Sequence, residues 1–388
     1  MLVKLGDICN ILNGFAFKSE NYVNSGIRVI RIQNVQKGFV EDNNPAFYPA
    51  DTKGLDKYLL ENNDLLISLT GNVGRVAILE KNMLPAALNQ RVACLRLKSN
   101  NITKRYLFHY LNSNRFEQNC IHASNGIAQK NLSTEWLKDY EISLHNIKEQ
   151  NTISNILDSV SHIISLRNQQ LEQLDLLIKS RFVEMFGDPV KNEKGWKIKE
   201  IQSVSKVGSS KRFYQEELSV SGVPFLRIAD ILNKIDNKEN EANSYISEEQ
   251  YFELLKQNLV PKENDVLITS RGTIGKCYII SKYDRFYFQD GMITWLSNFD
   301  QYLSSKFLYY SFEMDGIRKQ IDRMQAGSTV AYLSIAMIKK LNIIIPPIAL
   351  QNQFAAFVEE VEKEKATVKQ SLEWLNTLKA KLMQDYFG

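Results

Sequence analysis

Two short loops combine glycines, polar residues and a cation in a pattern that suits contact with phosphate groups. They are Gly71-Asn72-Val73-Gly74-Arg75 and Gly272-Thr273-Ile274-Gly275-Lys276, and each directly follows a predicted strand. Glycine lets the backbone come close to a phosphate chain, and the cation supplies the opposite charge. We do not expect a nucleotide-hydrolysing Walker loop, because that motif needs four residues between its glycines and Ser or Thr after Lys. Two residues intervene here and Cys277 follows. A tight β-turn with a solvated cation explains the same pattern, so both interpretations stay open.

Polar, cationic and aromatic residues also gather near the start of each half of the chain. Arg, Gln and Asn side chains make bidentate contacts to base edges, whereas Lys and Ser usually hold phosphates. Any surface loop can carry these residue types, so the pattern alone does not decide the function. The predicted DNA-contacting residues are Phe17, Lys18, Ser19, Arg28, Arg31, Gln33, Asn34, Thr70, Asn72 and Arg75 in the first half, and Ser209, Ser210, Lys211, Arg212, Arg227, Asp230, Arg271, Thr273 and Lys276 in the second.

The residue types that usually carry catalysis form no recognisable set. The histidines His109, His122, His145 and His162 are scattered, and no HExxH or GxSxG motif occurs. The sequence Asn44-Pro45-Ala46-Phe47 lacks the second proline of the Asn-Pro-Pro-Phe signature of adenine methyltransferases, so we interpret it as a turn. We therefore expect no catalytic residue, no metal site and no cofactor bound by this chain.

Length and composition indicate a soluble globular protein with at least two domains. A chain of 388 residues exceeds what one hydrophobic core usually supports, and its apolar share of 44% and charged share of 24% are ordinary. The net charge of +4 permits nucleic-acid binding without arguing for it. Four widely spaced cysteines are expected to be reduced thiols, and we recognise neither a secretory segment nor a membrane span. These features predict a cytoplasmic protein.

The second half of the sequence repeats the first. Asp64-Leu65-Leu66-Ile67 returns 201 residues later as Asp265-Val266-Leu267-Ile268, and the same offset still relates Phe186-Gly187 to Phe387-Gly388. Nearer the start the offset shrinks, so the halves differ most in their early segments. The chain is therefore a tandem duplication.

Each half is predicted to be an α+β domain followed by a long helix. Short β-rich runs between Gly, Asn and Pro clusters indicate a mixed or antiparallel sheet. The predicted strands are 29–35, 65–69, 76–79 and 92–97 in the first half and 224–228, 266–269 and 277–280 in the second; the predicted helices are 104–119, 133–139 and 305–323. The predicted divisions are a first domain at 1–146, a central helix at 147–189, a second domain at 190–347 and a C-terminal helix at 348–388.

Both long segments carry a heptad pattern of apolar residues. Each would form a helix of roughly 60 Å, and a helix with so narrow an apolar stripe needs a partner to bury it. We expect the two to pair as an antiparallel coiled coil with pseudo-two-fold symmetry; the alternative is that each lies on its own domain. The predicted interface residues are Ile153, Leu157, Val160, Ile164, Leu171 and Leu174 in the first helix, and Phe354, Val358, Val361, Val368, Leu372 and Leu375 in the second.

The sequence resembles the specificity subunit of type I restriction-modification enzymes. Gly14-Phe15-Ala16-Phe17-Lys18-Ser19, followed by residues 27–35, looks like the start of a target recognition domain of that family, and residues 222–231 are similar to the same pattern. Residues 265–275 and the helix that ends at 179–189 match as well. The resemblance covers nearly the whole chain in the family's order: recognition domain, helix, recognition domain, helix.

The resemblance implies a non-catalytic subunit that holds two copies of an adenine-methylating subunit, and ATP-driven restriction subunits, on double-stranded DNA. Each recognition domain would read one half of an asymmetric, bipartite target, and the helix pair would set the unread spacer. S-adenosylmethionine would belong to the methyltransferase partner, and ATP and Mg to the restriction partner. The family's base-reading residues vary with the target, so the residues named above rest on their chemistry alone.

Two rival interpretations stay open at this point. A self-contained DNA methyltransferase or nuclease with fused recognition domains would bind S-adenosylmethionine or cut DNA unaided. A coiled-coil scaffold would have no role on DNA.

Overall fold

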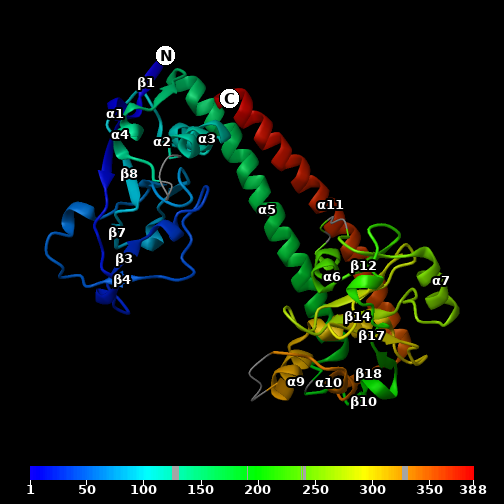
Figure 1. The fold of residues 1–388 in the computed structure, drawn as a ribbon. Helices are drawn as coiled ribbons and strands as arrows, with labels where there is room; N and C mark the ends of the chain where they lie inside the picture. The colour runs from blue at the N-terminus through cyan, green and yellow to red at the C-terminus, as the bar shows by residue number, and fades with distance from the viewer. Residues whose placement is uncertain (125–130, 190, 237, 239–241, 326–330) are drawn as a thin grey trace. The chain divides into compact units, whose positions relative to one another are not determined.

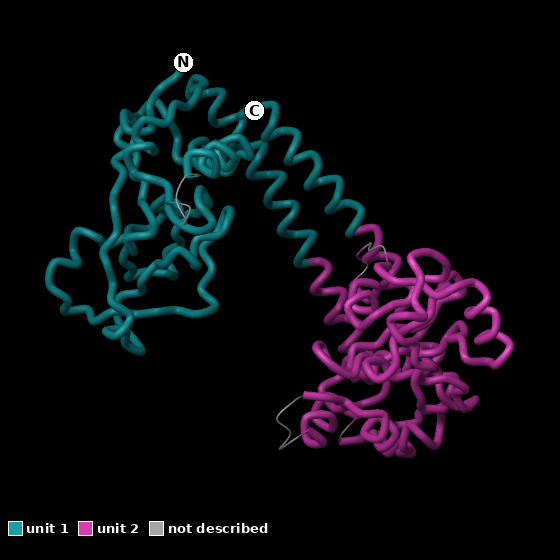
Figure 2. The backbone as a smooth tube through the Cα atoms, in the orientation of Figure 1, with its two compact units in different colours: residues 1–169, 369–388 teal, residues 170–368 magenta. Residues whose placement is uncertain are grey.

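A computed structural model describes residues 1–124, 131–189, 191–236, 238, 242–325 and 331–388. The chain divides into two compact units, unit 1 with residues Met1–Gln169 and Lys369–Gly388, and unit 2 with residues Gln170–Val368 (Figure 2). Each unit is α+β, as predicted, and each contains one portion of both long helices, α5 (Ile147–Phe186) and α11 (Ile348–Phe387).

Unit 1 is built on three small sheets (Figure 1). A four-stranded antiparallel sheet has the order β2-β8-β5-β6, a mixed sheet has the order β4-β3-β7 with β3 parallel to β7, and β1 pairs with β9. The strands are β1 (Leu2–Lys4), β2 (Cys9–Asn13), β3 (Ile27–Ile30), β4 (Phe47–Tyr48), β5 (Leu65–Ser68), β6 (Val76–Ile78), β7 (Ala86–Leu88), β8 (Val92–Leu97) and β9 (Glu141–Ser143). The short helices are α1 (Leu5–Ile8), α2 (Lys104–Leu111), α3 (Asn114–Ala123) and α4 (Thr134–Asp139).

Unit 2 repeats this plan with the sheets β11-β17-β14-β15, β13-β12-β16 and β10-β18. Its strands are β10 (Lys197–Glu200), β11 (Lys206–Gly208), β12 (Val223–Leu226), β13 (Tyr245–Ile246), β14 (Val266–Thr269), β15 (Cys277–Ile279), β16 (Tyr287–Phe288), β17 (Ile293–Ser297) and β18 (Asn342–Ile345). Its helices are α6 (Ile228–Ile235), α7 (Glu248–Lys256), α8 (Ser305–Glu313), α9 (Asp315–Gln325) and α10 (Ile335–Lys339). The duplication therefore extends from the sequence to the order of strands in every sheet.

Four predicted elements differ from the structure. The strand expected at 224–228 stops at Leu226, and α6 begins at Ile228. The helix expected at 104–119 is two helices, because Ser113 starts a new one by accepting a hydrogen bond from Phe116 N. The helix expected at 305–323 is likewise interrupted, at Met314. The strand expected at 29–35 stops at Ile30, and a 3-10 turn follows at Ile32–Asn34.

Within unit 2, α5 and α11 pack against each other in opposite directions. Lys365 of α11 forms an ion pair with Asp175 of α5 at 2.7 Å, and farther along α5 the ring of Phe182 meets that of Phe354. Residue numbers rise along one helix as they fall along the other, so the pair is antiparallel. The predicted interface residues of this portion lie in the unit 2 core, with Leu171 half-buried and Leu174, Phe354, Val358, Val361 and Val368 buried.

Within unit 1, the start of α5 and the end of α11 share the core of the globular portion. Ile153 and Leu157 lie in one apolar cluster with Phe387, whose ring meets that of Tyr106 at 5.4 Å. Among the remaining predicted interface residues, Val160 and Leu375 are buried, and Ile164 and Leu372 are half-buried.

A buried glutamine attaches each long helix to its globular portion. Gln150 Oε1 accepts a hydrogen bond from Thr103 N at 2.9 Å, and its Nε2 donates to Asn101 O at 2.8 Å. The equivalent Gln351 makes the same contacts with Ser304 N and Tyr302 O. Since both side chains are fully buried and satisfied, they fix the start of each helix on its own unit.

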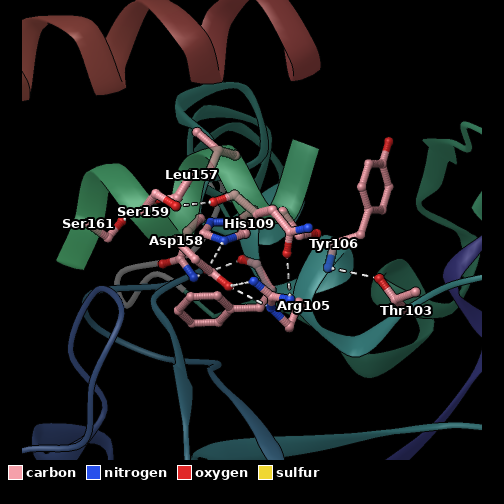
Figure 3. Close-up of polar contacts among 12 residues, drawn as sticks. Thr103, Arg105, Tyr106, His109, Leu157, Asp158, Ser159 and Ser161 are labelled. Carbon is pink, nitrogen blue, oxygen red and sulfur yellow. Dashed lines mark hydrogen bonds and ion pairs between the residues drawn. The ribbon is translucent and has the colours of Figure 1, made fainter. Parts of the chain in front are cut away.

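Each unit has a charged contact near this glutamine, between Arg105 and Asp158 in unit 1 and between Lys306 and Glu359 in unit 2. Figure 3 shows Arg105 and His109 of α2 directed at Asp158 of α5. Arg105 Nε donates to Asp158 Oδ2 at 2.5 Å, and His109 Nε2 lies 2.5 Å from Asp158 Oδ1. Tyr310 occupies the place of His109 in unit 2.

Candidate nucleic-acid interface

Three loops meet at one edge of unit 1. The segment after β2 lies against the turn between β7 and β8, because Gln90 N donates to Phe15 O at 3.0 Å. Gly14 leaves no room for a side chain there, since a Cβ atom would lie 2.2 Å from the carbonyl carbon of Asn89. The glycine loop after β5 joins the same edge, because the preceding Leu69 N donates to Arg91 O at 2.9 Å.

The equivalent loops meet in unit 2 and bring several predicted residues together. Ser209 Oγ accepts a hydrogen bond from Gly291 N at 3.3 Å, and Tyr332 OH donates to Gly291 O at 3.3 Å. The guanidinium of Arg271 lies 5.0 Å from the centre of the Tyr332 ring. These contacts place the loops after β11, β14 and β16 side by side.

Two cations of the loop after β11 are held near this edge. Lys211 N donates to Tyr287 OH at 2.7 Å, and burial raises the pKa of Tyr287 to about 12, so its hydroxyl stays protonated. Arg212 Nε donates to Asp290 Oδ2 at 2.7 Å, which raises the pKa of Arg212. The Lys211 side chain remains exposed.

The glycine loop of unit 1 is a compact hairpin. Ser68 Oγ accepts a hydrogen bond from Arg75 N at 3.0 Å and donates to Asn72 O at 2.5 Å. Arg75 donates in turn to the side chain of Gln36. Arg75 therefore faces a neighbour in its own unit, whereas Asn72 at the loop tip is exposed.

Unit 2 builds its glycine loop in the same way. Thr269 Oγ1 accepts a hydrogen bond from Lys276 N at 3.0 Å and donates to Thr273 O at 2.5 Å. Lys276 Nζ lies 3.1 Å from Glu313 Oε1 of α8. In this structure the amine of Lys276 forms an ion pair within unit 2, and its contact with DNA stays a prediction.

Two arginines predicted to read bases also have internal partners. Arg28 Nη1 donates to Met83 O at 3.0 Å, and Arg28 Nη2 lies 3.2 Å from Asp42 Oδ2. Arg31 donates to Asn44 O. In this structure both side chains connect the strand to neighbouring loops of unit 1.

Asn34 and Asp230 play one structural role at equivalent positions. Asn34 Oδ1 accepts a hydrogen bond from Arg31 N at 2.9 Å, and Asp230 Oδ2 accepts one from Arg227 N at 2.8 Å. Each side chain is thus the N3 residue of a capping box at the start of the turn or helix that follows β3 or β12. Asn34 is only 4% exposed and has this structural role, and a base contact by Asn34 stays a prediction.

The other predicted residues divide by exposure. Phe17 packs its ring 4.8 Å from that of Tyr48, and Thr70 Oγ1 and Ser210 Oγ are buried without a partner among the described residues. The residues whose side chains are exposed are Lys18, Ser19, Gln33 and Asn72 in unit 1, and Lys211, Arg212, Arg227, Arg271 and Thr273 in unit 2.

Sequence reasoning missed the turn between β7 and β8 and its counterpart. Gln90 and Arg91 are exposed beside the two predicted loops of unit 1, and Asp290 and Tyr332 hold Arg212 and Arg271 in unit 2. Local sequence patterns did not indicate these positions, because the contacts that bring them to the edge join segments far apart in sequence. The repeat was the only sequence feature that related them.

Among the described residues, no group of three or more His, Cys, Asp or Glu side chains is placed to hold a metal ion. The helices in the same described part of the chain include none that is long and apolar enough to cross a membrane. All four cysteines are buried free thiols, and burial raises the pKa of Cys9 to about 12.

Comparison with known proteins assigns a family to this doubled arrangement. The family model described as type I restriction modification DNA specificity domain matches residues 1–176 and 193–376. The chain belongs to this family. Each specificity-domain match covers one globular portion together with most of the long helix that follows it.

Similarities to individual proteins support the same family assignment. A Haemophilus influenzae protein assigned as a type I restriction enzyme specificity subunit is 27% identical over 70% of this chain, and the alignment spans 67% of its own length. The type I restriction enzyme MjaVIII specificity subunit of Methanocaldococcus jannaschii is 29% identical over 45% of this chain and 42% of its own. A crystal structure of a type I restriction-modification S subunit from M. genitalium has the same fold, with a TM-score of 0.57, 15% identity and coverage of 100% of this chain and 96% of that one.

Proposed function

We propose that this chain is the DNA-reading specificity subunit of a type I restriction-modification enzyme and has no catalytic residue of its own. The observation that carries the proposal is the doubling of the specificity domain, with exposed polar and cationic side chains gathered at the same loop edge of each unit. Because the early segments of the two units differ, each unit would read a different half of an asymmetric target. Phosphate contacts from Lys18 and Lys211 would hold the duplex.

The chemistry would come from partners. Two copies of an adenine-N6 methyltransferase subunit, each with S-adenosylmethionine, would dock on the helix pair, and restriction subunits would bring ATP and Mg. Exposed apolar side chains on α5 support this docking, with Ile163 and Leu166 in unit 1 and Leu176 and Leu177 in unit 2 all more than 40% exposed. We expect this assembly to act in the cytoplasm.

Domain exchange tests the proposal directly. Residues 1–146 are replaced by those of a relative with a different target, and methylated adenines are mapped in cells that carry either chain together with the methyltransferase. One half of the target should change while the other half and the spacer stay. Exchange of residues 190–347 is the matched control and should change the opposite half. If both exchanged chains directed methylation to the same target as the original chain, the proposal would be contradicted.

The rival enzyme interpretation is not favoured by the family match. It predicts that the purified chain alone binds S-adenosylmethionine or cuts DNA, and we expect neither activity.

A further inference from the structure

A cavity of about 700 Å³ lies in unit 1 between the turn that joins α2 to α3 and the last turns of α11. Lys37, Arg115 and Lys379 line it, and its lining contains no Asp or Glu. Small-molecule sites in proteins have volumes in this range. The cavity therefore combines room for a ligand with an excess of positive charge.

Lys379 is the cation without a partner. Lys37 Nζ lies 2.5 Å from Glu117 Oε2, and Arg115 Nη1 donates to Gly388 O at 3.2 Å. Lys379 is half-buried, and no described residue forms a hydrogen bond or ion pair with its amine. Burial and then the charge of Lys37 lower the pKa of Lys379, and Asp158 only partly opposes them. A bound anion would relieve this unfavourable environment.

Unit 2 provides an internal comparison, because a cavity of about 240 Å³ lies at the equivalent place. Its three carboxylates pair with Lys276 and Lys365 at 2.7 to 3.1 Å. The offset of 201 residues relates Glu313, Glu362 and Asp175 of this cavity to the neutral Asn112, Ser161 and Asn376 of the larger one. The same offset relates Ile178 to Lys379. At these equivalent positions unit 1 therefore has neutral residues where unit 2 has carboxylates, and a lysine where unit 2 has an isoleucine.

We propose that the cavity in unit 1 binds a phosphate group through Lys379, Arg115 and Lys37. The N-terminus of α3 opens on the same cavity through Asn114 and Arg115, and unpaired N–H groups at a helix start favour anions. Arg and Lys side chains form charge-assisted hydrogen bonds to phosphate oxygens, in DNA as in small molecules. The phosphate belongs either to the DNA backbone, in which case the inference rests on the proposed function, or to a small phosphorylated molecule.

One wall of the cavity would recognise the rest of a small ligand. Asn112 Nδ2 donates to Phe108 O at 2.9 Å, while its buried Oδ1 has no partner among the described residues. A hydroxyl or amino group of the ligand would satisfy this oxygen, and DNA backbone phosphates carry no such donor.

The test compares the full-length chain with Lys379→Ile, which introduces the residue of unit 2, and Asn112→Glu, which introduces the carboxylate of Glu313. Lys381→Gln is the matched control, because Lys381 is an exposed lysine of α11 outside the cavity. Thermal melting checks that each variant folds, and two different substitutions keep the test decisive if one does not. The probes are inorganic pyrophosphate, measured by calorimetry, and a duplex DNA whose binding is followed as a function of salt.

Each outcome has one meaning. If the phosphate comes from DNA, the affinity of Lys379→Ile for the duplex depends less on salt, and its slope of log affinity against log salt is less negative by about 0.9. Lys381→Gln has a smaller effect. If it is a free phosphate group, pyrophosphate binds the wild type and the control alike, and binding falls at least tenfold in Lys379→Ile and Asn112→Glu. The inference is overturned if Lys379→Ile binds duplex DNA with the same salt dependence as the wild type and neither substitution in the cavity weakens the binding of pyrophosphate. A chain that binds no duplex at all would refute the proposed function, while the pyrophosphate measurement would still decide the cavity.

Discussion

At the scale of residues, Gly74 shows why the glycine loop needs its glycines. It has a φ of +79°, and a Cβ atom would lie 2.9 Å from Cys120 Sγ. Gly74→Ala should lower the free energy of unfolding by about 2 to 4 kcal/mol, from backbone strain and overpacking together. Gly54→Ala is the control, because Gly54 has a φ of +78° with nothing within 4 Å and should lose only about 1 kcal/mol. Urea unfolding measures both, and equal losses would refute the packing argument.

His109 predicts how stability depends on pH. Burial lowers the pKa of His109 below 6.5, and Asp158 opposes this only in part. A lowered pKa in the folded state means that the unfolded chain takes up the proton more readily. The contribution of His109 is therefore complete above pH 6.5 and is lost as pH falls through its folded value. Thermal melting should show that wild type loses more stability than His109→Gln between pH 7 and pH 5. A constant difference between the two proteins would contradict this assignment.

At this scale, the sequence indicates which side chains are chemically suited to contact DNA better than it indicates which neighbours they contact. Lys18, Lys211 and Arg271 were chosen for residue type and do lie exposed at the loop edges. Arg28 and Lys276 were chosen on the same grounds, but their partners Met83 and Glu313 come from segments that only the tertiary fold brings close. Residue type therefore selects candidates, and distant partners decide which of them stay available.

At the scale of elements, the two buried glutamines should dominate the attachment of each long helix. Gln150→Ala leaves Thr103 N and Asn101 O without partners, and Gln351→Ala does the same to Ser304 N and Tyr302 O. Each should lower the free energy of unfolding by about 1 to 3 kcal/mol, because buried polar groups lose their hydrogen bonds. Asn151→Ala, at the exposed next position, should change it by less than about 0.5 kcal/mol. Chemical denaturation measures all three, and an equal effect of Asn151→Ala would argue against a special role for the glutamines.

Elements were predicted well where a periodic pattern is long. The bounds of α5 and α11 follow from long heptad patterns without Gly or Pro, in which only Arg167 and Lys365 replace an apolar seam residue. The interruption between α2 and α3 was missed because the apolar periodicity continues through it, and only the cap at Ser113 marks the break. The 3-10 turn after β3 was also missed. Asn34, which caps this turn, was assigned to DNA recognition and not to capping.

At the scale of the whole molecule, the length of the helix pair should determine the spacer of the DNA target. Four residues inserted near the middles of both α5 and α11 add about 6 Å. That length corresponds to roughly two base pairs at 3.4 Å each. Mapping of methylated adenines should then find both half-targets unchanged and a spacer longer by about two base pairs. Insertion into α5 alone is the control: it shifts the seam that joins Asp175 to Lys365 and should abolish methylation instead. If the double insertion leaves the spacer of the methylated target unchanged, the length of the helices does not determine the separation of the two half-targets. The two specificity domains of this chain would then read DNA independently of their helices, and another part of the enzyme would set that separation.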